Sequence, residues 1–134
     1  MYRFSRKERH FLEVQRVGRW AQVGTDGLPH ATPLCYAFSK GVIYIGTERD
    51  SWKVQNLRAG TWVAFVVDEY TEEWDSLRGI RLWATAEVLR QGPEYQAAKR
   101  LLFRKYPQWR RLGWTDGETV VLKLTPQRAT AWGV

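Results

Sequence analysis

Four side chains suited to holding a phosphate group lie close together in this chain: Thr47, Arg49, Ser51 and Lys53. They stand where a run of β-branched and aromatic residues, typical of a strand, gives way to the pattern of a short helix. A helix start presents unpaired backbone N–H groups and the positive end of the helix dipole, so it favours an anion. Hydroxyl and cationic side chains at the same place add charge-assisted hydrogen bonds. The segment is therefore a candidate anion site.

The same segment is also compatible with an ordinary helix cap. Asp50 and Ser51 are both good N-cap residues, so spacing alone does not separate a cap from an anion site. If a phosphate binds here, Ser51 is the better cap, because a carboxylate at Asp50 would repel it.

The flanking sequence predicts the elements that position this segment. Apolar runs predict seven strands, at residues 20–23, 29–38, 42–47, 61–68, 80–89, 119–124 and 128–133. The strand at 61–68 is almost entirely apolar, so it is expected to be central and buried on both faces. Helical spacing predicts three helices, at 5–17, 51–59 and 93–106, which end at Gly18, Gly60 and Pro107.

Short turns such as Asp26-Gly27 join most of these strands, which implies antiparallel pairing. A sheet of so many short strands within 134 residues closes most naturally into a barrel. Residues 1–134 are therefore expected to form one α+β domain, a small barrel with about three helices.

Composition excludes several classes of protein. An apolar fraction of 44% with eight tryptophans excludes a disordered chain. No apolar run approaches the ~20 residues of a membrane span, and no apolar segment of a signal peptide follows the basic N-terminus, so a cytoplasmic protein is expected. The lone Cys35 and the widely separated His10 and His30 predict no disulfide and no metal site.

The net charge of +7 invites a nucleic-acid hypothesis. Much of the excess lies in residues 3–19 and 99–111, which are expected to be helices with solvated basic faces. Nucleic acid is therefore not the expected partner. The alternative hypothesis, from a different functional class, is a non-catalytic basic barrel that binds single-stranded nucleic acid.

In its motifs and their order the chain resembles the pyridoxamine 5′-phosphate oxidase-like, FMN-binding split-barrel superfamily. The resemblance covers residues 10–133 and rests on short motifs at fixed spacing. These are Asp26-Gly27-Leu28-Pro29-His30, Tyr44-Ile45-Gly46-Thr47, Ser51-x-Lys53, Asn56-Leu57, Val67-Asp68, Gly79-Ile80-Arg81 and Pro126…Trp132. It implies a six- to seven-stranded antiparallel split β-barrel that dimerises and binds a flavin.

The resemblance also implies roles for particular residues. Thr47 and Lys53 match family positions that bind the cofactor phosphate, with Ser51 and Arg49 as helpers. The segment Thr32-Pro33-Leu34-Cys35 would lie along the flavin ring, with backbone amides at the ring edge. Trp132 falls where family members carry a tryptophan near the ring, often in the site of the partner subunit; a core or interface aromatic is the alternative.

One departure from the family pattern concerns the reaction. The oxidases carry an arginine and a lysine where this chain has Thr32 and Ala37. Pyridoxamine-phosphate oxidase activity is therefore not expected. Cys35 is expected to be a buried filler rather than a nucleophile. His30 is expected to be a surface imidazole, with a position facing the substrate as the alternative.

The function implied is that of an oxidoreductase whose cofactor carries the redox chemistry, so no catalytic side chain is assigned. FMN is the expected cofactor and the deazaflavin F420 the alternative. Haem ranks third, because only His10 and His30 offer imidazole ligands. A flavin carrier without turnover stays open, and a homodimer is expected.

Overall fold

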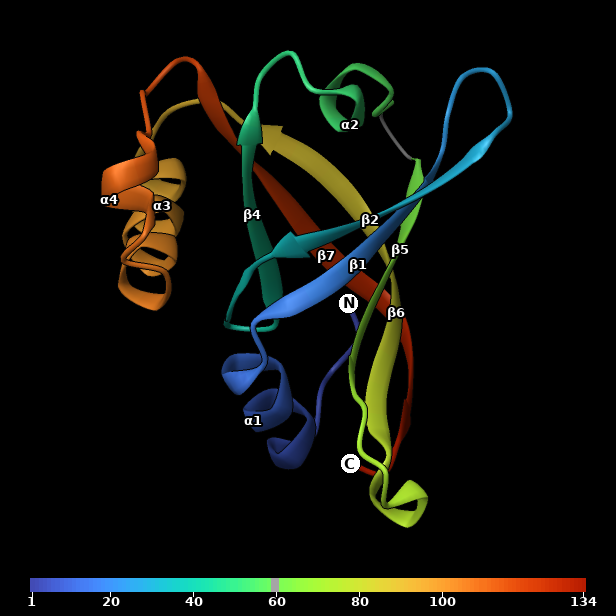
Figure 1. The fold of residues 1–134 in the computed structure, drawn as a ribbon. Helices are drawn as coiled ribbons and strands as arrows, with labels where there is room; N and C mark the ends of the chain where they lie inside the picture. The colour runs from blue at the N-terminus through green and yellow to red at the C-terminus, as the bar shows by residue number, and fades with distance from the viewer. Residues whose placement is uncertain (59–60) are drawn as a thin grey trace.

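Seven strands form one curled antiparallel sheet in the order β2-β1-β5-β6-β7-β4-β3 (Figure 1). The structure is a computed structural model that describes residues 1–58 and 61–134. The strands are β1 Val17–Val23, β2 Pro29–Cys35, β3 Ala37–Ser39, β4 Val42–Glu48, β5 Trp62–Glu69, β6 Arg78–Leu89 and β7 Thr119–Trp132. The helices are α1 Arg6–Val14, α2 Trp52–Gln55, α3 Pro93–Lys105 and α4 Trp109–Leu112, with a short 3₁₀ turn at Trp74–Ser76.

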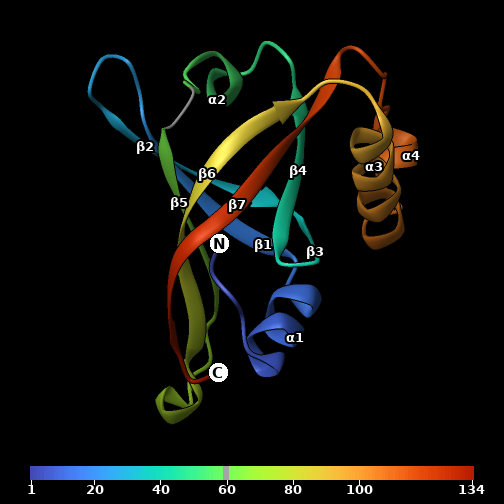
Figure 2. The same ribbon diagram turned by 180° about the vertical axis from the view of Figure 1, so that it is seen from behind.

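The two edges of the sheet are consecutive in sequence, because only Tyr36 separates β2 from β3. The sheet therefore curls into a barrel with a split between β2 and β4, as Figures 1 and 2 show from opposite sides. The Tyr36 hydroxyl donates to the Leu12 carbonyl at 2.6 Å, and the Tyr36 backbone N–H donates to the Tyr106 hydroxyl at 3.1 Å. The α+β split-barrel prediction is confirmed.

Strand alternation builds the core. On each of the central strands every second side chain points into the barrel and is buried. The largest of these are Trp20, Phe65, Ile80, Leu82, Leu122, Ile43 and Ile45. Helix α1 closes one end with Phe11 and Leu12, both buried.

The predicted first helix has the right start and the wrong end. Ser5 accepts from the Glu8 N–H and Glu8 accepts from the Ser5 N–H, which is the capping box that the sequence indicates. The helix ends at Val14 and not at Gly18, which lies inside β1. Gly18 is required there because a Cβ at that position would overlap the Phe65 ring.

Three strand predictions need correction. The run 29–38 is two strands, broken at Tyr36 where the barrel edge turns. The runs 119–124 and 128–133 are one strand, because a register shift between Trp83 and Ala84 of β6 accommodates Pro126. Strand β5 is buried on one face only, and its other face carries the half-exposed Trp62.

Two helix predictions also change. Helix α2 stops at Gln55, with Asn56 as its C-cap, so it is shorter than the predicted 51–59 helix; Ala59 and the predicted stop at Gly60 lie outside the described residues. Helix α3 begins at Pro93 as predicted and packs on β3, β4 and β7. Helix α4 was not predicted, because a four-residue helix has too little periodicity to detect.

Candidate cofactor site at the strand–helix joint

The joint between β4 and α2 brings two of the predicted phosphate ligands together. Thr47, near the end of β4, donates from its hydroxyl to the Ser51 hydroxyl at 3.2 Å. Ser51 has the extended backbone of an N-cap, which confirms its predicted position, but its side chain makes no capping hydrogen bond. Both hydroxyls are half-buried and retain acceptor and donor capacity for a ligand.

Lys53 follows in α2, two residues after Ser51, and carries a positive charge. Its side chain is half-buried, and burial lowers the pKa of its ammonium below the usual 10.5. Among the described residues no carboxylate forms an ion pair with it. A partly desolvated cation without a counter-charge gains from an anionic ligand. The residues therefore fit the phosphate of a cofactor.

Arg49 lies in the turn between β4 and α2. Its guanidinium contacts the Asp50 carboxylate at 3.5 Å and the Gly117 carbonyl at 3.4 Å. It lines a hollow of about 310 Å³ together with three carboxylates, those of Glu48, Asp50 and Glu118. The structure thus places Arg49 in an acidic setting.

His30 is half-buried with its Nε2 enclosed, so the expectation of a surface imidazole is wrong. Its ring stacks on the Trp52 ring, with centroids 3.7 Å apart and planes inclined by 32°. His30 Nε2 is buried and has no hydrogen-bond partner among the described residues. A buried polar atom without a partner marks a place where a ligand group or water is expected. Strand alternation in β2 could have indicated this enclosed position, since it places His30 on the same face as Thr32.

Strand alternation also divides the predicted ring-binding segment between two faces. Thr32 and Leu34 are half-buried, whereas Pro33 and Cys35 are exposed. Strand β2 is an edge strand, which is why it tolerates prolines and why its outer backbone groups have no partner among the described strands. Those groups are free to bond a ligand, as the backbone role predicted for this segment requires.

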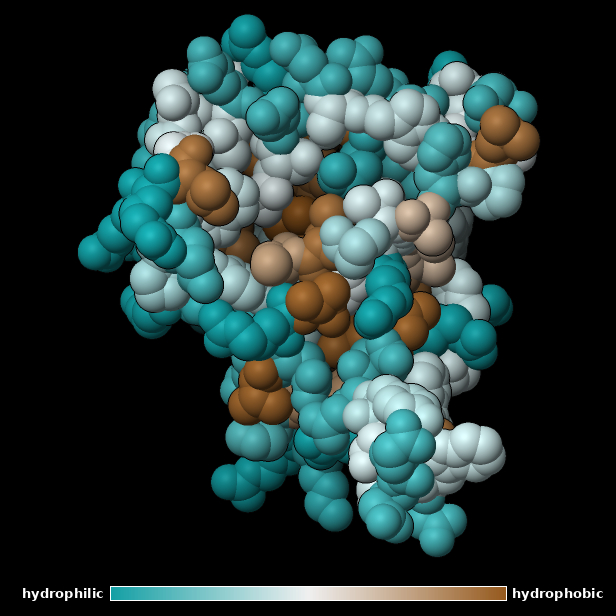
Figure 3. Space-filling view, in the orientation of Figure 1, coloured by the Kyte–Doolittle hydropathy of each residue, from teal (hydrophilic) through white to brown (hydrophobic). Residues whose placement is uncertain are grey.

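An apolar hollow adjoins the end of this segment. Cys35, Tyr106, Gln108, Trp109 and Leu112 line a space of about 220 Å³. Figure 3 shows apolar atoms gathered in a hollow in the middle of this face, where β4 and β2 lie in Figure 1. The expectation that Cys35 is buried is wrong, because its side chain points outward from the edge strand.

Trp132 lies far from the joint within one chain. It ends β7 beside Gly79, at the opposite end of the molecule from α2 (Figure 1). Its side chain is 41% exposed. Trp74 is also at this end and more exposed, with its indole N–H donating to the Tyr70 hydroxyl. These aromatics can contact a ligand at the joint only if they belong to another subunit.

A family model matches nearly the whole chain, and a named reductase matches about two thirds of it. The profile of the family described as pyridoxamine 5′-phosphate oxidase matches residues 4–133. A 5a,11a-dehydrotetracycline/5a,11a-dehydrooxytetracycline reductase from Streptomyces rimosus is 36% identical over 95 residues. That alignment covers 66% of this chain and 66% of the relative.

Solved structures share the fold. A conserved hypothetical protein, Rv2991, from Mycobacterium tuberculosis superposes with a TM-score of 0.83 at 25% identity, covering 97% of this chain and 85% of that one. A heme binding protein from Mycobacterium smegmatis gives 0.76 at 22% identity, covering 99% and 56%. A protein titled F420 reductase gives 0.68 at 19% identity, covering 90% and 94%.

Proposed function

Because the chain belongs to the pyridoxamine 5′-phosphate oxidase family, we propose that it is an oxidoreductase that binds a phosphate-bearing flavin-type cofactor, with the phosphate at Thr47, Ser51 and Lys53. The observation that carries this proposal is the half-buried Lys53 ammonium, which has no carboxylate partner in the described chain. The reductase name of the Streptomyces rimosus relative supports the reaction class.

The protein's part in this function is to hold and orient. Lys53 balances the phosphate charge, and the Thr47–Ser51 hydroxyl pair adds hydrogen bonds to the phosphate oxygens. The outer edge of β2, with Thr32, Pro33, Leu34 and Cys35, offers backbone groups to the ring. The apolar hollow beside Cys35 excludes water from one side of it. Hydride or electron transfer is the chemistry that the cofactor supplies when bound.

FMN is the first cofactor to test and F420 the alternative, and each carries a phosphate that this joint suits. Haem is a further alternative, since family-fold neighbours include a protein titled as heme binding. Only His10 and His30 among the described residues offer an imidazole, and His30 is confined against Trp52.

The experiment is a visible spectrum of the purified protein, followed by titration with FMN, F420 and haem. The proposal expects saturable binding of FMN or F420 with an altered spectrum. Binding of haem alone, or of none of the three, would overturn it. A cofactor-bound protein without turnover over a substrate panel would be a carrier.

A symmetric homodimer is part of this proposal. Trp62 and Trp83, on the face of β5 and β6 that one chain leaves open, line a shallow hollow of about 210 Å³ with Ala64, Val23 and Pro29. An apolar strand exposed on one face suggests burial against a second copy. A dimer would also allow Trp132 of one subunit to approach the joint of the other.

Trp62→Asp tests the dimer directly, because it places a charge in that face without touching the core. We expect the mass in multi-angle light scattering to fall from two chains to one. The control is Val14→Asp at the end of α1, a similarly exposed apolar side chain outside that face, which should stay dimeric. A monomeric wild type would contradict the proposal.

A further inference from the structure

The positive charge of this chain is concentrated in one segment. Residues 95–115 contain no Asp or Glu, so this segment alone contributes +6 to the net +7. Its cations are Lys99, Arg100, Arg104, Lys105, Arg110 and Arg111. The segment forms most of α3 and all of α4, well apart from the joint at Lys53 (Figure 1).

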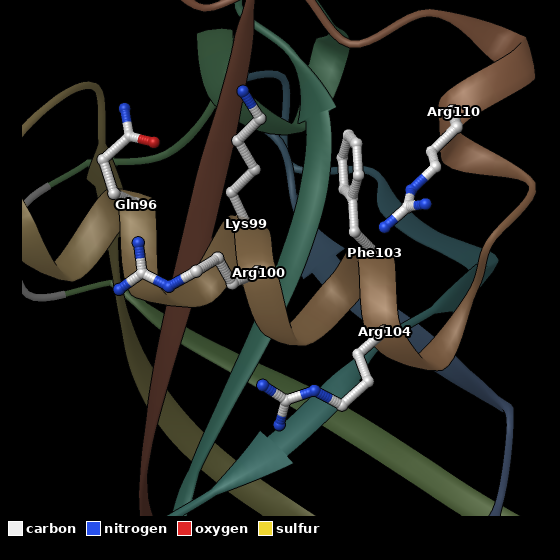
Figure 4. A pocket seen from close by; sticks show the side chains of 6 residues that line it. All are labelled: Gln96, Lys99, Arg100, Phe103, Arg104 and Arg110. Carbon is white, nitrogen blue, oxygen red and sulfur yellow. The ribbon is translucent and has the colours of Figure 1, made fainter.

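Helix periodicity gathers several of these side chains on one face. Tyr95, Ala98 and Leu102 are buried against the barrel. Residues at positions 96, 99, 100, 103 and 104 follow the i, i+3, i+4, i+7 spacing of a second face, which α4 borders. Together they form an open groove of about 470 Å³, shown in Figure 4, lined by Gln96, Lys99, Arg100, Phe103, Arg104 and Arg110.

Within the part of the chain that the structure describes, Lys99 is the one cation of this groove with a carboxylate partner. Lys99 pairs with Asp116 at 2.9 Å, and hydrogen bonds from Lys99 and Gln96 lower the pKa of Asp116 to about 2, so this pair stays ionised. The guanidinium groups of Arg100, Arg104 and Arg110 form no ion pair or hydrogen bond with the described residues. Arginine is suited to bidentate contacts with phosphate oxygens.

An aromatic ring lies among these arginines. Phe103 is half-buried and meets Trp114 edge to face, with centroids 5.6 Å apart and planes at 71°. The Trp114 ring packs in turn on Trp109 at 5.1 Å. Figure 4 shows Arg110 extending from α4 toward Phe103, and Lys99 rising on the other side of the ring. The packing fixes the Phe103 ring, and a planar base can rest against a ring held in this way.

We propose that the groove between α3 and α4 is a second ligand site, which binds a nucleoside polyphosphate. The phosphate chain contacts Arg100, Arg104 and Arg110, and the base rests on Phe103. This site is independent of the cofactor proposed for the Lys53 joint.

The test is calorimetric titration with ATP at about 0.15 M salt, where long-range attraction between exposed charges is largely screened. Tryptophan fluorescence gives a second readout, because Trp109 and Trp114 pack beside the groove. Tripolyphosphate and a short oligothymidylate are titrated in parallel. The variants are Arg104→Gln/Arg110→Gln and Phe103→Leu, and Arg3→Gln/Arg6→Gln removes the same charge elsewhere as a control.

We expect ATP to bind and the Arg104→Gln/Arg110→Gln variant to lose at least about tenfold in affinity. The control variant should stay within about twofold. Phe103→Leu should weaken the binding of ATP and leave the affinity for tripolyphosphate unchanged. FMN and F420 titrations of all variants should match the wild type.

Three results would overturn the proposal. One is the absence of ATP binding, and another is an equal loss in the two double variants, which would indicate general charge attraction. The third is binding of the oligothymidylate without ATP, which would make the groove a nucleic-acid surface. If Phe103→Leu loses equal affinity for ATP and for tripolyphosphate, the base does not contact Phe103.

Discussion

The turn after β4 and the short helix α2 carry two cations in different surroundings, and the contrast between them decides where an anion can bind. Arg49 faces Asp50 and the loop that contains Gly117 and Glu118, so its charge is already met by acidic and carbonyl oxygens. Lys53 is half-buried and has no such partner within the described residues. A basic residue near a helix start is thus not enough for an anion site. What matters is whether the protein has already balanced its charge.

Charge reversal at the two positions is expected to give the largest difference. Lys53→Glu removes the only unpaired cation at the described joint and adds a repelling carboxylate. Cofactor affinity should fall at least about 100-fold. Arg49→Glu should change it by less than about threefold, because its surroundings already hold three carboxylates. Fluorescence titration with FMN and F420 measures both; equal losses would erase the distinction between the two positions.

His30→Phe is expected to separate ligand binding from stability. Phenylalanine keeps the stacking on Trp52 and removes the buried nitrogen that has no partner in the described chain. The free protein should melt at the same temperature or higher, since an unsatisfied buried polar atom costs about 1–3 kcal/mol. Cofactor affinity should fall about tenfold if Nε2 bonds the ligand. A lower melting temperature with unchanged affinity would show that His30 is structural.

Thr47→Val is expected to have a smaller effect. It keeps the strand shape and removes the hydroxyl that bonds Ser51 at 3.2 Å. The loss of about one neutral hydrogen bond predicts a threefold to tenfold weaker cofactor affinity. Thr47→Ser is the matched control and should bind as the wild type does. If valine binds equally well, the hydroxyl pair does not contact the phosphate.

The pH dependence of binding is expected to be the mildest effect. Burial lowers the pKa of Lys53 below 10.5, so the ammonium is lost earlier than usual as pH rises. Since the protonated lysine binds the phosphate dianion, affinity should be greatest above the phosphate pKa of about 6 and fall on the alkaline side. Lys53→Arg keeps its charge, so its affinity should not fall there. A matching decline in both proteins would assign the pH effect to another group.

Local signals in the sequence were sufficient for much of the fold. The capping box at Ser5, the Asp26-Gly27 turn and Pro93 at a helix start are short-range features, and each forms where it was predicted. Barrel closure at Tyr36 and the passage of β7 through Pro126 depend on partner strands. No window of the sequence contains that information.

For the candidate site too, the local features were predictable and the features that depend on distant residues were not. The residue types at Thr47, Ser51 and Lys53 indicate anion binding, and the structure joins the two hydroxyls. The direction of Arg49 was not predictable, because it depends on Gly117 in a loop 68 residues later. The stacking of the half-buried His30 ring involves Trp52 from another element. Exposure of Cys35 follows from its place on an edge strand, which only the strand order reveals.

The most direct test of the central claim, that Lys53 holds the cofactor phosphate, is the ratio of FMN to riboflavin affinity in wild type and in Lys53→Ala. Riboflavin has the same ring and lacks the phosphate; for F420 the phosphate-free deazaflavin serves equally. The account predicts that wild type binds the phosphorylated form at least about tenfold more tightly, as expected from the free energy of one charge-assisted hydrogen bond. It predicts that Lys53→Ala loses most of this preference while riboflavin binding stays the same. An unchanged ratio in Lys53→Ala would contradict it.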